Sequence, residues 1–131
     1  MKVVIAGIRY EDPVNKIVFD NYPLLVKAIT DSGYKISEII SGAAIGVDTL
    51  GETYAGANNI PVNRKPANWN KYGKRAGPMR NKEMALLADA AVILWDGESK
   101  GTRNMIDNMI ALNKPYFLML TKTNTLESFF Q

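Results

Sequence analysis

Short apolar runs alternate along the chain with longer segments in which apolar residues recur every three or four positions. A short run rich in β-branched residues is typical of a buried strand, whereas the wider spacing predicts a helix. The pattern predicts strands over residues 2–6, 36–40, 60–64, 91–95 and 115–120. It predicts helices over about 14–30, 46–58, 79–88 and 102–112, and Pro23 predicts a kink or a break in the first.

Strands that alternate with helices predict a parallel sheet with helices on both faces. We therefore expect an α/β protein, a Rossmann-like three-layer α/β/α sandwich with a five-stranded, mainly parallel sheet in the order 3-2-1-4-5. The prediction places one domain over residues 1–120 and a polar C-terminal tail over residues 121–131. In such a sheet, ligands bind beyond the carboxyl ends of the strands, where the strand order reverses.

Composition excludes several kinds of chemistry. The chain has 131 residues, about one domain, and contains no Cys and no His. It therefore has no thiol nucleophile, no Ser-His-Asp triad, no disulfide and no usual zinc site, and we predict neither a metal nor a cofactor. No apolar run approaches the ~20 residues that span a bilayer, and the apolar start is too short for a signal peptide. These features predict a cytoplasmic protein without membrane contact.

Positive charge is concentrated in one segment. The net charge is +3, but residues 64–82 carry +7, so the remaining residues sum to −4. Much of this segment, 66–78, is rich in Gly, Pro and Asn and is predicted to be mostly loop, of a length that favours a functional role. The segment indicates an anionic ligand, or else a solvated basic loop. Its cations are Arg64, Lys65, Lys71, Lys74, Arg75, Arg80 and Lys82.

Glycines, cations and small polar residues follow the predicted strands, where a ligand would lie. Two loops lead into helices, whose first N–H groups favour an anion. Each feature also has a structural explanation: an Arg lying over an aromatic ring, tight packing of a helix on the sheet, a Thr cap, or a Trp that anchors its loop. A small phosphate-bearing ligand explains them together. The candidate ligand-binding residues are Gly7, Arg9, Ser41, Gly42, Ala43, Gly46, Asp48, Trp69, Lys74, Gly77, Arg80, Asn81, Gly97, Lys100, Gly101 and Thr102.

Neither of two common nucleotide-binding motifs is present. The glycines after the second strand stand four apart, unlike the Gly-x-Gly-x-x-Gly fingerprint, and no Gly-Lys-Ser/Thr follows them as in a P-loop. Instead, residues 41–48 (SGAAIGVD) resemble the "SGGAxGxD" turn of the SLOG superfamily. Residues 68–81 (NWNKYGKRAGPMRN) resemble the signature of its small stand-alone YspA-like branch. Residues 7–11 (GIRYE) and Gly101-Thr102 are similar to two further motifs of that branch, and the resemblance spans about residues 2–120.

The resemblance implies a Rossmann-like fold, homo-oligomers and the binding of nucleotides or nucleotide-derived ligands. Many such proteins are thought to act as sensors or binders in nucleotide signalling and bacteria–phage conflict, so a bacterial or phage origin is implied. The related LOG proteins hydrolyse the N-glycosidic bond of nucleoside 5′-monophosphates with an Arg and a Glu. Arg80 matches that Arg, but Met105 stands at the Glu position and Ile45 at the position of a further Arg.

Three functions remain open from the sequence. The favoured one is a nucleotide-binding module that senses, sequesters or regulates. The second is a nucleotide N-glycosidase, whose transition state needs a carboxylate that Met105 cannot supply. The third is a nucleic-acid binder that uses the basic segment, with Trp69 and Tyr72 as stacking platforms. The catalytic candidates for the second function are Arg80, Glu83, Asp96 and Glu98, with Glu11 as a further carboxylate.

Overall fold

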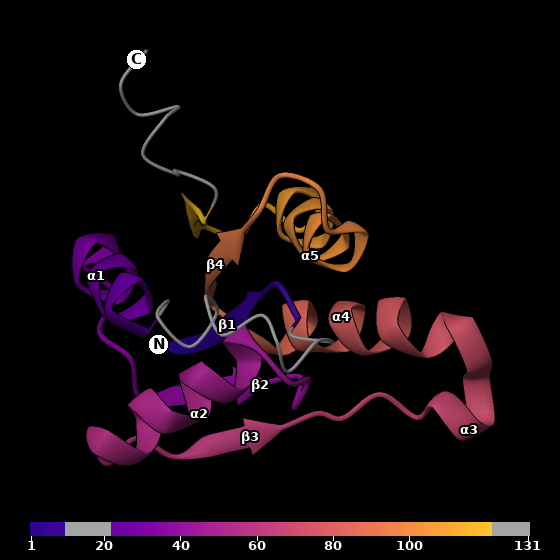
Figure 1. The fold of residues 1–131 in the computed structure, drawn as a ribbon, viewed down its shortest axis with the longest axis horizontal. Coiled ribbons are helices and arrows are strands. Elements are labelled where there is room, and N and C mark those ends of the chain that lie inside the picture. Colours follow the sequence, from indigo (N-terminus) through magenta and orange to yellow (C-terminus); the bar gives the residue numbers. More distant parts are fainter. Residues whose placement is uncertain (10–21, 122–131) are drawn as a thin grey trace.

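A computed structural model describes residues 1–9 and 22–121 (Figure 1). Strands and helices alternate as predicted, with one short helix and one 3-10 helix inserted before α4. The strands are β1 (Lys2–Gly7), β2 (Glu38–Ser41), β3 (Val62–Arg64), β4 (Ala90–Trp95) and β5 (Tyr116–Leu120). The helices are α1 (Tyr22–Ser32), α2 (Val47–Ala57), α3 (Trp69–Tyr72), the 3-10 helix η2 (Gly73–Arg75), α4 (Ala76–Leu87) and α5 (Lys100–Ala111).

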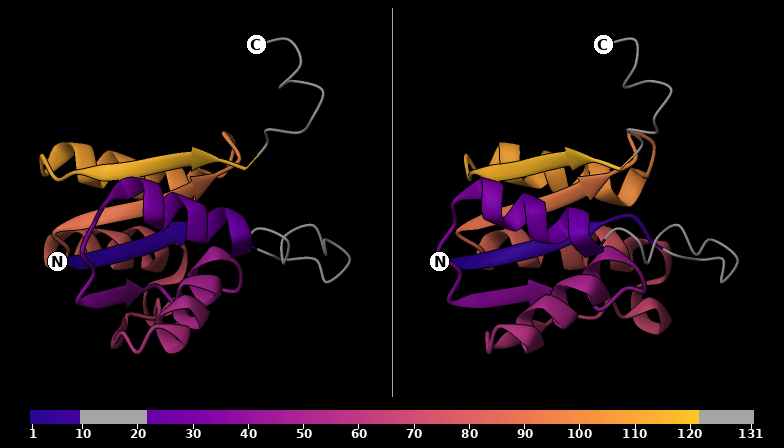
Figure 2. Two further views of the ribbon diagram at one scale, coloured as in Figure 1. Left: turned by 90° about the vertical axis from the view of Figure 1, so that its left-hand side faces the viewer. Right: turned by 60° about the vertical axis from the view of Figure 1, so that its left-hand side comes forward.

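The five strands form one parallel sheet in the order β3-β2-β1-β4-β5, which confirms the predicted topology. Figure 2 shows the arrows of the central strand β1 and the edge strand β5 pointing the same way. The order reverses beside β1, because the chain moves outward to β2 and β3 and then returns to β4 on the other side. A crevice is expected at the carboxyl end of this reversal.

Alternating side chains of the strands fill two separate cores, one on each face of the sheet. In β1, Val3 and Ile5 pack with α1 and α2, whereas Val4 and Ala6 pack with α4 and α5. All four are buried, because successive side chains of a strand point to opposite faces and both faces here are covered. The result is the three-layer α/β/α sandwich that the sequence predicts.

The segment 66–78 corrects one prediction. It contains α3, η2 and the first turn of α4 rather than mostly loop. Asn68 caps α3, since its Oδ1 accepts the Lys71 N–H at 3.1 Å. Pro78 lies in the first turn of α4, where a helix has no partner for an N–H, so its missing donor costs no hydrogen bond.

Several element ends also differ from the predictions. Helix α1 begins at Tyr22, so Pro23 lies in its first turn, and the predicted helical residues 14–21 lie outside the described residues. Helix α5 begins at Lys100 rather than Thr102, which places Gly101 inside its first turn. Most of the predicted tail, residues 122–131, is likewise outside the described part. In residues 1–9 and 22–121, no helix is long and apolar enough to cross a membrane.

Candidate functional site

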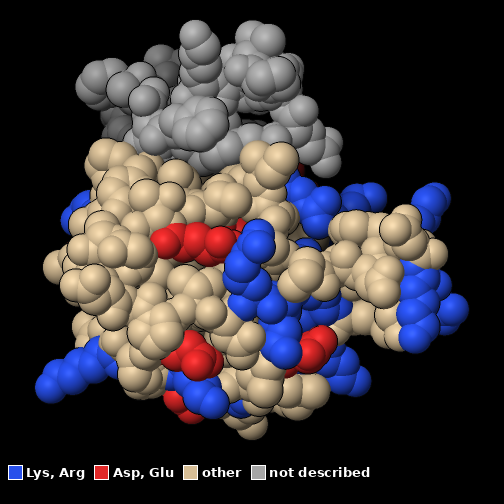
Figure 3. Space-filling view, turned by 90° about the horizontal axis from the view of Figure 1, so that it is seen from below, with Lys and Arg blue, Asp and Glu red and all other residues tan. Residues whose placement is uncertain are grey.

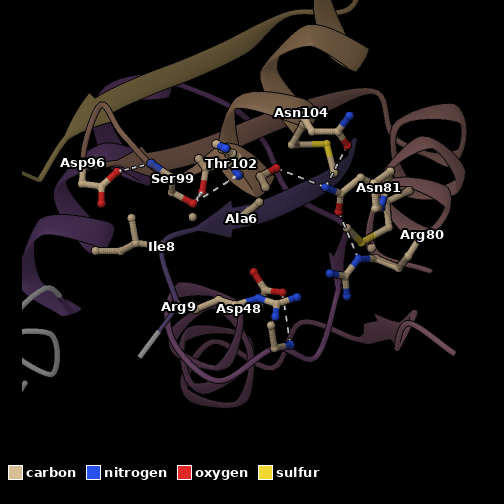
Figure 4. Close-up of a pocket in the computed structure, with 18 of the residues that line it drawn as sticks. Ala6, Ile8, Arg9, Asp48, Arg80, Asn81, Asp96, Ser99, Thr102 and Asn104 are labelled. Atoms are coloured by element: carbon tan, nitrogen blue, oxygen red, sulfur yellow. Dashed lines mark hydrogen bonds between the residues drawn. The ribbon is translucent and has the colours of Figure 1, made fainter. Parts of the chain in front are cut away.

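A cavity of about 600 Å³ opens at the carboxyl ends of β1 and β4, at the reversal of strand order. Its walls come from the loop after β1, the start of α2, the first half of α4 and the start of α5 (Figure 4). The lining residues are Ala6, Gly7, Ile8, Arg9, Ala44, Asp48, Trp69, Gly77, Pro78, Arg80, Asn81, Met84, Asp96, Ser99, Lys100, Gly101, Thr102, Asn104 and Met105.

Arg80 forms a buried cationic wall of this cavity. Its side chain is only 8% exposed, and α4 presents it toward the loop after β2. Nη1 donates to the Gly42 carbonyl, and Nε donates to Asn81 Oδ1 at 3.0 Å. No hydrogen bond within the described residues uses Nη2. Since no fully buried side-chain nitrogen there lacks a partner, Nη2 keeps some exposure and can donate to a ligand.

Asn81 holds Arg80 in this orientation and links α4 to α5. Its Oδ1 accepts from Arg80 Nε, while its Nδ2 donates to the Gly101 carbonyl at 3.2 Å and to Asn104 Oδ1 at 3.1 Å. Asn81 is itself 8% exposed. A guanidinium that is bonded on two sides loses little rotamer entropy when it binds, which favours affinity.

Asp48 is a buried carboxylate on the cavity wall. It lies in the first turn of α2, is 7% exposed, and accepts the Ala44 N–H through Oδ2 at 3.2 Å. Burial raises its pKa to about 6, although the charges of Arg80 and Arg9 favour the ionised form. Burial in turn lowers the pKa of Arg80, and the charge of Asp48 opposes that change.

Gly42 brings these two charges together. A Cβ atom at this position would lie 2.6 Å from Arg80 Nη1 and 2.7 Å from Asp48 Oδ2, closer than real contacts allow. A side chain at this position would therefore displace the guanidinium or the carboxylate, and glycine leaves both in place. Among the described residues, no ion pair joins Asp48 directly to Arg80 or to Arg9.

Arg9 and Trp69 form the more exposed wall. The Arg9 guanidinium carbon lies 5.3 Å from the centroid of the Trp69 ring, within the range of a cation–π interaction. Trp69 is 47% exposed, and both residues also line a smaller adjoining cavity of about 380 Å³. An exposed indole beside a guanidinium offers a surface on which a planar group can stack.

The start of α5 forms the wall opposite Asp48 (Figure 4). The N–H groups of Lys100 and Gly101 are the first of the helix and have no acceptor within it. Ser99 caps the helix and accepts from the buried Thr102 hydroxyl at 3.1 Å. Asp96 turns the preceding loop, since its Oδ1 accepts the N–H groups of Glu98 and Ser99 at 2.8 and 2.7 Å.

The structure brings most of the predicted residues to these two cavities. Gly42 and Ala43 line the smaller cavity, and the others that line a cavity border the larger one. Four predicted residues line neither cavity. Ser41 donates to Glu52 Oε2 at 2.7 Å, and Gly46 precedes α2 with a φ of 133°. Lys74 lies on the exposed 3-10 helix η2, and Gly97 lies in the turn after β4.

The carboxylates predicted for catalysis separate into two groups. Asp96 lines the larger cavity, whereas Glu83 and Glu98 do not. Glu83 instead pairs with Lys65, whose Nζ lies 3.4 Å from its Oε1. The predicted candidate Glu11 lies outside the described residues.

Sequence reasoning interpreted Asp48 as a ligand-binding residue at a helix start and did not consider it as a buried acid. Asp48 is buried beneath the loop that carries Ala44, and the charge with the largest effect on it is that of Arg80, which the fold brings from α4. Met105, at the position of the LOG glutamate, is 1% exposed and lines the cavity as an apolar surface. Within the described residues, no group of three or more acidic side chains is placed to hold a metal ion.

No protein-family model matches the chain, and comparisons with the curated proteins and with the solved structures find no similar protein. The resemblance carried by residues 41–48 and 68–81 therefore stays a prediction.

Proposed function

We propose that the protein binds a nucleotide or a nucleotide-derived phosphate ligand in the larger cavity, as a sensing, sequestering or regulatory module. One observation carries the proposal: Arg80 is 8% exposed and lines the cavity, its Nε and Nη1 are held by the protein, and no described residue accepts a hydrogen bond from its Nη2. A buried guanidinium with an open donor is expensive to keep unless an anionic ligand completes its hydrogen bonds.

The surroundings of Arg80 favour a phosphate rather than a simple carboxylate as the bound anion. Lys100 and the first N–H groups of α5 line the same cavity and supply several further donors for a tetrahedral anion. The Arg9–Trp69 wall adds a surface suited to a base. A volume of about 600 Å³ lies within the range of small-molecule sites.

Calorimetric titration with the four ribonucleoside 5′-monophosphates and with inorganic phosphate tests this proposal. We expect measurable binding of at least one nucleotide, and a loss of more than about 100-fold in affinity for Arg80→Ala. Lys82→Ala is the matched control, since it removes a cation from the same helix without touching either cavity. An Arg80 variant that binds as tightly as the wild type would contradict the placement of the site.

A second candidate function is hydrolysis of the N-glycosidic bond of a nucleotide. It is favoured by Asp48, a buried carboxylate whose pKa is raised to about 6 and which faces the same cavity as Arg80. A carboxylate with a pKa near neutrality can act as a general acid or base. Chromatography of the nucleotides after incubation with the protein distinguishes the two functions: free base released by the wild type but not by Asp48→Asn would show hydrolysis.

A further inference from the structure

This inference rests on the proposed nucleotide site and concerns Asp48, which a site made only for phosphate does not explain. Oδ2 of Asp48 accepts the Ala44 N–H, and no other hydrogen bond within the described residues reaches this carboxylate. No buried side-chain oxygen there lacks a partner, although Asp48 is only 7% exposed. Its second oxygen, Oδ1, therefore keeps some exposure and is available as an acceptor for a ligand in the cavity that Asp48 lines.

The charges of Arg80 and Arg9 stabilise the ionised form of this carboxylate, but neither side chain donates a hydrogen bond to it. Arg80 is already bonded to Gly42 and Asn81, and no direct ion pair of Asp48 is found within the described part of the chain. An ionised carboxylate only accepts hydrogen bonds, and a phosphate dianion both lacks a donor and repels it. The part of the ligand beside Asp48 must therefore be a hydrogen-bond donor other than the phosphate.

The layout of the cavity indicates which donor this is. Figure 4 shows Asp48 across the cavity from Ser99 and Thr102 at the start of α5, with Arg80 to one side of them. A phosphate held by Arg80 and by the first N–H groups of α5 leaves the space beside Asp48 Oδ1 to another part of the ligand. Trp69, the stacking surface for a base, is 47% exposed, whereas Asp48 is nearly covered. The group that joins the phosphate to the base is the sugar, and its hydroxyl groups are donors. Carboxylates in other nucleotide-binding folds accept from a ribose hydroxyl in the same way.

We infer that Asp48 accepts a hydrogen bond from the ribose 2′-hydroxyl of the ligand, so that the cavity binds ribonucleotides in preference to 2′-deoxyribonucleotides. The expected discrimination is about 10- to 100-fold, the effect of one hydrogen bond to a charged acceptor.

Calorimetric titration of the wild-type protein with paired 5′-monophosphates tests the inference without altering the chain. Each ribonucleotide is compared with its 2′-deoxy and 2′-O-methyl counterparts, which lack the 2′ donor. We expect both analogues to bind at least about tenfold more weakly than the ribonucleotide. Equal binding of the three would overturn the inference while leaving the proposed function standing. Binding of none of them would overturn both.

Two variants then assign the discrimination to Asp48. Asp48→Ala removes the acceptor, and we expect its ribo-to-deoxy affinity ratio to fall to about one. Asp48→Asn keeps the shape and a neutral acceptor, so its ratio should lie between those of Asp48→Ala and the wild type. Asp107→Asn is the matched control, because it neutralises an exposed carboxylate of α5 that lines neither cavity and should leave the ratio unchanged. A ratio that stays at the wild-type value in Asp48→Ala would overturn the assignment, and circular dichroism verifies that each variant is folded.

Discussion

Arg80 and four other cations of the segment 64–82 lie in opposite environments. Arg80 is buried at the cavity wall, and both its Nε and its Nη1 are bonded to the protein. Lys71, Lys74, Arg75 and Lys82 are exposed on α3, η2 and α4 and line neither cavity. Figure 3 shows Lys and Arg side chains exposed on one face of the molecule.

The difference between these groups determines their effect. An exposed charge keeps its water and is screened by salt, so it contributes little to holding one small ligand. A buried charge has already lost its water, so an anion bound to it gains more than in solvent. We therefore expect Arg80 to determine affinity, and the exposed cations to affect mainly the rate at which an anion approaches.

The largest expected effect is that of Arg80→Ala. Besides the loss of binding described above, the change leaves the Gly42 carbonyl and Asn81 Oδ1 without their buried donor. Leaving a buried acceptor without its donor destabilises a protein by about 1–3 kcal/mol. Chemical denaturation monitored by circular dichroism measures this, and Lys82→Ala should change the free energy of unfolding by less than about 0.5 kcal/mol. Equal losses for the two variants would remove the distinction between buried and exposed cations.

Gly42→Ala should have the next largest effect. The new Cβ would lie 2.6 Å from Arg80 Nη1 and 2.7 Å from Asp48 Oδ2, so one of these side chains must move. We expect nucleotide affinity to fall by about 10- to 100-fold, since small displacements of positioned groups have effects of this size. Gly56→Ala is the control: a Cβ there meets nothing within 4 Å, and the change should stabilise α2 by about 0.5–1 kcal/mol. Wild-type affinity in Gly42→Ala would contradict the described geometry.

The raised pKa of Asp48 makes a pH-dependent contribution to stability. The folded protein holds this proton up to a pH of about 6, whereas the unfolded chain releases it near the ordinary value of 3.8. The folded state therefore binds more protons between these values, and the free energy of unfolding from this group falls as pH rises from 4 to 6, by about 2–3 kcal/mol. Denaturation curves across this range should show a shallower pH dependence in Asp48→Asn. Identical slopes would contradict the burial of this charge.

The smallest expected effect is that of removing exposed cations. The triple variant Lys71→Ala/Lys74→Ala/Lys82→Ala should change mononucleotide affinity by less than about threefold. The same variant tests the nucleic-acid hypothesis with a single-stranded oligonucleotide as the probe. If the exposed cations bind a nucleic-acid backbone, the wild type will show oligonucleotide affinity that falls steeply with salt, and the variant will show a smaller slope.

The fold could be predicted from the sequence because its pattern is local. The run Val3–Ala6 is apolar and short, and the segments on either side of the later strands have helical spacing. A helix that connects two neighbouring strands of one sheet leaves them parallel, so the pattern predicts a parallel sheet. The prediction that residues 66–78 are mostly loop is wrong, because it rests on their content of Gly, Pro and Asn alone. Asn68 and Pro78 instead act at helix starts, positions that favour these residue types.

The candidate site was predictable only in part. The carboxyl ends of the strands follow from topology, and the predicted start of the helix over residues 79–88 places Arg80 beside them. The roles of Asp48 and Asn81 depend on contacts between distant segments: the Ala44 loop covers Asp48, and Asn81 joins Arg80 to α5. No pattern within one helix or strand specifies such contacts, so burial and hydrogen bonding required the three-dimensional structure.

The most direct test of the account compares nucleoside and nucleotide binding in wild type and in Arg80→Lys by calorimetry. Lys keeps the charge but lacks the fork that reaches Gly42, Asn81 and the cavity together. We predict that the wild type binds a ribonucleoside 5′-monophosphate at least about 100-fold more tightly than its nucleoside, and that Arg80→Lys loses most of this preference. Equal affinity for nucleoside and nucleotide in the wild type, or a preference that survives in Arg80→Lys, would contradict the central claim that Arg80 binds the phosphate.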